Sequence, residues 1–129
     1  MLLRKYMSMI GIGSATIDLM LPKQTYRAGE YIKGTFLIKG GIIDQKAKRI
    51  ECDLIMVHSS TGEEKTMNTL TILTSRVIQA EEIHNLSFSF KIPSSVPAST
   101  KERSYRFETK LFFTEGVTSK DQDAIYIVQ

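Results

Sequence analysis

Strict alternation of apolar and polar residues is the feature that most constrains this chain of 129 residues. From Leu86 to Ile92, apolar side chains alternate with Ser87, Ser89 and Lys91. Successive side chains of a β-strand point to opposite faces, so this pattern predicts strands with one buried face and one wet face. No stretch of helical length carries an apolar stripe with a 3.6-residue period. The sequence therefore predicts an all-β fold.

Turn residues divide the chain into about seven or eight predicted strands. Besides 86–92, the predicted strands cover residues 14–21, 31–39, 47–58, 65–78, 105–113 and 124–128. Pro22 ends the first strand because proline has no N–H to donate, and Gly40 and Gly41 are expected to take the positive φ of a tight turn. This strand count is typical of an antiparallel two-sheet β-sandwich of the immunoglobulin-like kind. We expect residues 1–13 to form an N-terminal arm and residues 14–129 a single sandwich domain.

Composition excludes several classes of protein. A single cysteine rules out a scaffold built on intramolecular disulfides. The apolar runs are shorter than the ~20 residues of a membrane-spanning helix, so no integral membrane segment is expected. Lys and Arg number 17 against 14 Asp and Glu, and a net charge of +3 is too small to call for a nucleic-acid partner. The N-terminal residues do not match a signal peptide, which predicts a cytoplasmic protein.

The residues that most often carry chemistry are few and poorly spaced. His58 and His84 have no further ligand at metal-binding spacing. Cys52 lies on the same predicted strand face as Ile50 and Leu54, which favours a buried small hydrophobe over a nucleophile. The sequence therefore predicts no catalytic, cofactor-binding or metal-binding residue, no cofactor and no enzymatic activity.

The glycines of 11–13 do not complete a dinucleotide-binding motif. That motif needs a third glycine where Thr16 stands, and a helix where this chain has a predicted strand. A flexible approach to the first strand is the better interpretation.

One basic run stands out, formed by Lys46, Lys48 and Arg49. No aromatic side chain is interleaved with these residues, and Glu51 and Asp53 follow closely, which disfavours a nucleic-acid site. Two interpretations stay open, a solvated strand start and a patch that binds an acidic partner.

Two motifs resemble those of arrestin-like domains. Their residues are Tyr26, Gly29, Glu30 and Gly34 in the first, and Phe88, Phe90, Pro93 and Pro97 in the second. Together with residues 11–18 and the turn at 39–41, they resemble the bacterial sporulation-control protein M (SpoOM) family from about residue 11 to residue 128. The motif residues are of scaffold type, since glycine relaxes backbone geometry and proline closes a strand.

This resemblance implies an arrestin-like β-sandwich that acts as a non-enzymatic adaptor in bacterial sporulation or cell-cycle control. Typical members of the family carry two such domains in tandem, and this chain resembles the amino-terminal one. A surface that normally faces a second domain can pair with itself, so a homodimer is also expected.

The expected partner of such an adaptor is another protein, bound through a sheet edge or face. Open sandwiches leave unpaired N–H and C=O groups at their edges, and the terminal strands 14–21 and 124–128 are the candidate edges. The alternative is an enzyme or a small-ligand-binding sandwich whose pocket no motif reveals.

Overall fold

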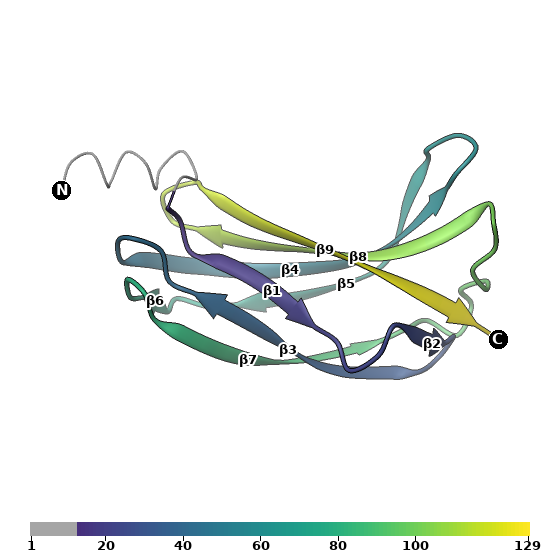
Figure 1. Ribbon diagram of the computed structural model, residues 1–129, viewed down its shortest axis with the longest axis horizontal. Coiled ribbons are helices and arrows are strands. Elements are labelled where there is room, and N and C mark those ends of the chain that lie inside the picture. The colour runs from purple at the N-terminus through teal and green to yellow at the C-terminus, as the bar shows by residue number, and fades with distance from the viewer. Residues whose placement is uncertain (1–12) are drawn as a thin grey trace.

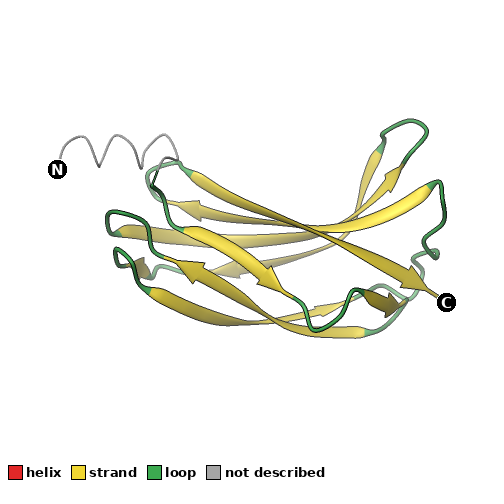
Figure 2. Ribbon diagram, in the orientation of Figure 1, coloured by secondary structure: helices red, strands yellow, loops and turns green. Residues whose placement is uncertain are grey.

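Nine strands and no helix are found among residues 13–129, the part of the chain that the computed structural model describes (Figures 1 and 2). They are β1 (Thr16–Met20), β2 (Thr25–Arg27), β3 (Tyr31–Lys39), β4 (Gln45–His58), β5 (Glu64–Leu73), β6 (Val77–Ile78), β7 (Ile83–Lys91), β8 (Arg103–Phe113) and β9 (Thr118–Val128). The predicted all-β class is therefore confirmed. The predicted arm of residues 1–13, which includes Gly11, lies outside the described residues. Gly13, its last residue, is described.

The strands form two sheets that pack face to face (Figure 1). The smaller sheet has the order β1-β3-β7, and the larger has the order β2-β9-β8-β4-β5, with β6 paired to the start of β4. All pairings are antiparallel except one, because β2 runs parallel to β9, with Thr25 opposite Tyr126. The predicted antiparallel two-sheet sandwich is confirmed, with this short parallel pairing as its one exception among the described residues. With three residues, β2 is too short to show an alternating pattern.

A cluster of phenylalanines joins the two sheets. Phe107 of β8 is fully buried, and its ring meets those of Phe88 and Phe90 of β7 edge to face, at centroid distances of 5.6 and 5.0 Å. Phe36 of β3 packs on Phe88 in the same manner, at 5.1 Å. Such pairs add about 0.5–1.5 kcal/mol each beyond the burial of their apolar area. The second motif thus supplies two of the rings that hold the layers together.

The first motif forms a turn with its own polar contacts. Tyr26 is buried, and its hydroxyl donates to the carbonyl of Lys23 at 2.8 Å. Glu30 accepts a hydrogen bond from the Arg27 amide at 2.9 Å and pairs with the Lys23 ammonium at 2.8 Å. Gly29 between them has a φ of 82°, which a residue with a side chain rarely adopts.

Close packing, rather than turn conformation, requires glycine at positions 40 and 41. Neither residue has a positive φ, so the predicted turn conformation is wrong at both positions. A Cβ at Gly40 would collide with the carbonyl oxygen of Gln79, and one at Gly41 with that of Gly13. Gly34 has a similar role, since a Cβ there would meet the carbonyl oxygen of Met20 on β1.

Two strands differ from their predicted bounds. The last strand is predicted over 124–128, but β9 already begins at Thr118. Its inward positions in this part are Ser119, Asp121 and Asp123, so no apolar alternation marks it. The segment 65–78 is two strands, β5 and β6, separated by residues 74–76.

Candidate interaction surface

The three basic residues of β4 differ in how their charges are engaged. Lys46 and Lys48 are exposed, whereas the Arg49 Nε donates to a carboxylate oxygen of Glu51 at 2.6 Å. The Arg49 guanidinium also lies 3.9 Å from the ring centroid of Phe112 on β8. The charge of Arg49 is therefore engaged by neighbours on its own sheet, and only the two lysines extend outward.

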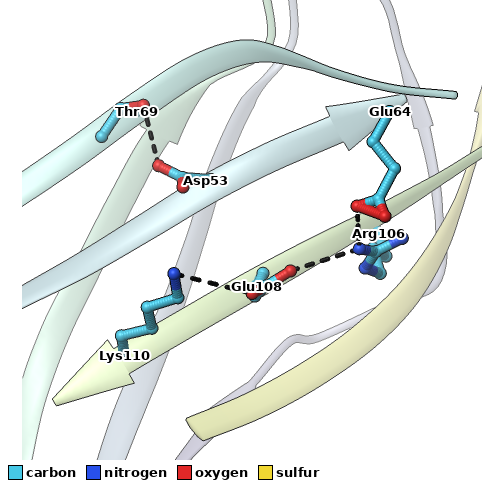
Figure 3. A network of polar contacts seen from close by, with 6 residues as sticks. All are labelled: Asp53, Glu64, Thr69, Arg106, Glu108 and Lys110. Atoms are coloured by element: carbon cyan, nitrogen blue, oxygen red, sulfur yellow. Dashed lines mark hydrogen bonds and ion pairs between the residues drawn. The ribbon is translucent and has the colours of Figure 1, made fainter. Parts of the chain in front are cut away.

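The outer face of the larger sheet carries mutually paired charges (Figure 3). Arg106 donates to Glu64 at 2.5 Å and to Glu108 at 3.2 Å, and Lys110 lies 3.8 Å from Glu108. Exposed pairs of this kind contribute about 0–1 kcal/mol each to stability. Their main effect is that this face presents compensated charge to a partner.

A groove of about 390 Å³ lies between the loop after Ser99 and the ends of β8 and β9. Arg103 and Tyr105 line it, but Arg103 donates to the carbonyl of Ala98 at 2.9 Å and the Tyr105 hydroxyl donates to the carbonyl of Pro97 at 2.5 Å. Burial raises the pKa of Tyr105. These polar groups therefore hold the loop in place. The volume is within the range of small-ligand sites.

Three carboxylates meet where the two sheets approach each other. Asp18 of β1 and Asp121 and Asp123 of β9 present oxygens that all lie within 4.8 Å of one another. Asp121 accepts a hydrogen bond from the Leu19 amide at 2.8 Å. One oxygen of Asp123 is buried and has no donor among residues 13–129. Sequence reasoning missed this group because its members lie on two strands that are distant in the chain.

The cluster favours uptake of a proton. Burial, then a hydrogen bond to Asp121 and the charges of Asp121 and Asp18, raise the pKa of Asp123 to about 7. Burial, followed by the charge of Asp121, also raises the pKa of Asp18, while the charge of Lys39 opposes this shift. A proton held by Asp123 would turn one of its oxygens into a hydrogen-bond donor toward Asp121. Carboxylates are also ligands of hard divalent cations.

Cys52 is buried, as its alternation pattern predicts. The Thr109 hydroxyl donates to its sulfur at 3.4 Å, and burial raises the pKa of the thiol to about 12. Because the thiolate is the reactive form, we expect 5,5′-dithiobis(2-nitrobenzoate) to label the folded chain far more slowly than the chain in guanidinium chloride. Equal labelling rates in the two conditions would contradict this placement.

Of the two candidate edge strands, β9 is covered on both sides and β1 is covered in part. β9 lies between β2 and β8. The outer edge of β1 is satisfied by β9 side chains, since Asp121 accepts from the Leu19 amide and the Ser119 hydroxyl donates to the carbonyl of Ala15. The candidate edge at 124–128 is therefore wrong, whereas β1, within 14–21, is an edge strand of the smaller sheet with two of its outward backbone groups bonded to β9 side chains. In the described part of the chain, β5 and β7 are the long strands with a neighbour on one side alone.

Partly buried apolar side chains gather between these two free edges. Met67, Leu70 and Ile72 of β5 and Leu86 of β7 account for four of the six partly buried hydrophobic residues that pack against the core. We call these four residues, together with the free edge of β7, the open side. Asn68 of β5 spans it at one end, where its side-chain amide donates to the carbonyl of Lys91 at 3.1 Å.

No helix among residues 13–129 is long and apolar enough to cross a membrane.

The family model described as "SpoOM protein" matches residues 3–129. The chain belongs to the SpoOM protein family. The sporulation-control protein spo0M of Bacillus subtilis (strain 168) is 29% identical over 130 residues, which cover 96% of this chain and 50% of that protein. This chain of the SpoOM family therefore spans about half the length of the curated relative it matches.

Solved structures agree with membership of the SpoOM family. The crystal structure of Spo0M, the sporulation control protein from Bacillus subtilis, matches with a TM-score of 0.82 and 29% identity, covering 92% of this chain and 51% of that one. A DUF4466 family protein from Parabacteroides merdae matches with a TM-score of 0.55 and 11% identity, over 88% of this chain and 45% of that one. The second likeness concerns the fold alone.

Proposed function

We propose that this chain is a non-enzymatic protein-interaction module that acts in sporulation control and binds its partner at the open side. The family and the B. subtilis relative, a sporulation-control protein, support the cellular role. The single observation that carries the binding role is the open side itself, where apolar side chains lie beside a free strand edge. Apolar surface next to unpaired backbone groups is the combination that strand-binding interfaces use.

The reactive groups of the described chain serve the scaffold, which favours an interaction role. The Cys52 thiol is not presented at the surface, because it is buried, and burial raises its pKa to about 12. Tyr105 holds the loop at Pro97. Asp18 and Asp123, whose pKa values are raised, lie where β1 and β9 meet. Lys46 and Lys48, which extend outward from β4, are a proposed secondary contact for an acidic partner.

Affinity capture from starving native cells, with crosslinking and mass spectrometry, tests this proposal. We expect reproducible enrichment of a signalling or division protein, with crosslinks at Lys65 of β5 or Lys91 of β7. Ile72→Asp should lower recovery about tenfold, because it places a charge among the apolar side chains of the open side. Leu73→Asp is the matched control, since the neighbouring Leu73 is 81% exposed and points to the opposite face of the same strand.

Equal recovery by the two variants would contradict binding at the open side, provided that both melt cooperatively. Recovery of the bait crosslinked only to itself would contradict the adaptor role and favour the homodimer. The alternative of a ligand-binding sandwich would then be favoured. The groove at Arg103 would be the first place to test for a small ligand.

A further inference from the structure

We infer that the open side accepts one extended strand of another polypeptide, which adds to the free edge of β7 and covers the inward face of β5. This inference rests on the proposed function and states the form of the partner. The partner segment is a strand with apolar side chains at alternate positions, turned toward β5, and polar side chains turned outward.

The backbone of β7 shows which of its groups face the free edge. At its two ends, the amide of Ile92 donates to the carbonyl of Glu30 at 2.9 Å, and the carbonyl of Glu82 accepts from the amide of Gly40 at 2.7 Å. Even-numbered residues therefore direct their backbone groups toward β3. Because this direction alternates along an antiparallel strand, Asn85, Ser87 and Ser89 direct theirs away from β3.

Asn68 provides an independent check of this alternation. It donates to the carbonyl of Lys91, an odd-numbered residue, from the side of β5. The Asn68 side chain therefore occupies one acceptor of the β7 edge, as a neighbouring strand would. At the other end of β7, residues 74–82 connect β5 to β7 by way of β6. Between this connection and the Asn68 contact, the backbone edge from Asn85 to Ser89 is left for a partner.

Between its two ends, β7 lacks the features that usually protect an exposed edge. It pairs with β3 over its whole length without a register shift, and it contains no proline. Between its ends, the outward side chains are those of Asn85, Ser87 and Ser89, which are small or neutral. By contrast, Met67 forms a bulge in β5, and bulges hinder the pairing of an edge with another chain. The pairing site is therefore β7.

The larger sheet extends beyond the smaller one on this side. β1 packs along β9 and β8, and β3 and β7 follow in order, so β5 extends past β7 except at the end where Asn68 contacts Lys91. The inward side chains of β4, such as Ile50 and Leu54, are accordingly buried, whereas Leu70 and Ile72 of β5 are only partly buried. A strand paired to β7 would lie about 4.8 Å further out and would cover these two side chains.

This offset favours a lone strand over a second folded copy. In a symmetric pairing of β7 with β7, each copy would bring its own larger sheet with it. Because β5 extends past β7 in both copies, the two β5 strands would compete for the same space. The occupant is therefore a segment without a second layer beneath it, such as an extended tail or loop of another protein.

A fluorescein-labelled peptide of alternating Thr and Val, flanked by Lys for solubility, tests the inference by fluorescence anisotropy. We expect saturable binding to the full chain. Ser87→Pro should weaken it about tenfold, since it removes an edge donor and introduces a ring where the peptide backbone must approach. Ser87→Thr is the matched control, because it keeps the N–H. Proline at this position leaves the β3 ladder intact, and the melting temperature checks this.

A second probe needs no protein variant. The same peptide methylated on alternate backbone nitrogens, so that its edge toward β7 has no N–H, should bind the unaltered chain at least about tenfold more weakly. Absence of saturable binding, equal affinity for both peptides, or equal affinity of the Ser87→Pro and Ser87→Thr chains would overturn the inference. A captured cellular protein that crosslinks away from β7 and binds Ser87→Pro normally would also overturn it, while leaving the adaptor role intact. Capture of no protein at all would instead remove the proposed function.

Discussion

Replacing Phe107 by alanine is expected to lower the free energy of unfolding by about 3–5 kcal/mol. Phe107 is fully buried, and it is the ring of the larger sheet that contacts Phe88 and Phe90 of the smaller one. Alanine would leave a cavity between the layers and remove two edge-to-face contacts. Urea unfolding followed by circular dichroism measures the loss, which should lower the midpoint at an unchanged slope.

Phe112→Ala is the control for this experiment. Phe112 lies on the same strand but points outward, where it is only partly buried beside Arg49. Its replacement should lower stability by about 1 kcal/mol, from lost apolar contact and the lost stacking of Arg49. A loss for Phe107→Ala no larger than this would contradict the assignment of Phe107 to the centre of the sandwich.

Stability should fall as the pH rises from about 4 to about 7. The pKa of Asp123 is raised to about 7 in the folded chain, from an ordinary value of 3.8. Between these values the folded chain holds a proton that the unfolded chain has released, so a higher pH favours unfolding. This loss of stability is complete once the pH is above the pKa of Asp123 in the folded chain. Urea unfolding at a series of pH values measures this slope.

Asp123→Asn should remove most of this slope and stabilise the chain by about 1–2 kcal/mol at a pH of about 8. A raised pKa of this size corresponds to ~4 kcal/mol, and partial exposure to solvent reduces it. Glu102→Gln, at an exposed position outside the cluster, should leave the slope unchanged. Retention of the full slope by Asp123→Asn would show that other groups control it. Glu30 and Glu82 have the opposite effect on the pH dependence of stability. Hydrogen bonds from Lys23 and Arg76 lower their pKa values, so their contribution to stability is lost as the pH falls.

Local alternation was sufficient to predict most of the fold. It located the strands around Phe36, Leu54, Phe88 and Phe107 because each places apolar residues on one face. It failed at the start of β9, where the inward side chains are carboxylates that serve the contact with β1. A polar group that is buried for a tertiary reason has no local signature.

The interaction surface could not be predicted from the sequence, because sheet order determines which edges are free. Both terminal strands were candidate edges, but β2 covers β9, and Asp121 and Ser119 bond two outward backbone groups of the β1 segment. The pairing of Arg49 with Phe112 likewise joins residues on two different strands. The pattern of Ser87 and Ser89 was visible in the sequence as a wet strand face, but not as a strand edge.

Amide hydrogen exchange, measured by NMR on the chain alone and with its captured partner, tests the central claim most directly. In the free chain, the amides of Asn85, Ser87 and Ser89 should exchange fast, while those of their even-numbered neighbours, bonded to β3, exchange slowly. Binding should slow the odd-numbered amides of β7 and leave the even-numbered ones unchanged. Protection confined to the groove at Arg103 or to the lysines of β4, with the β7 edge still exchanging fast, would contradict the account.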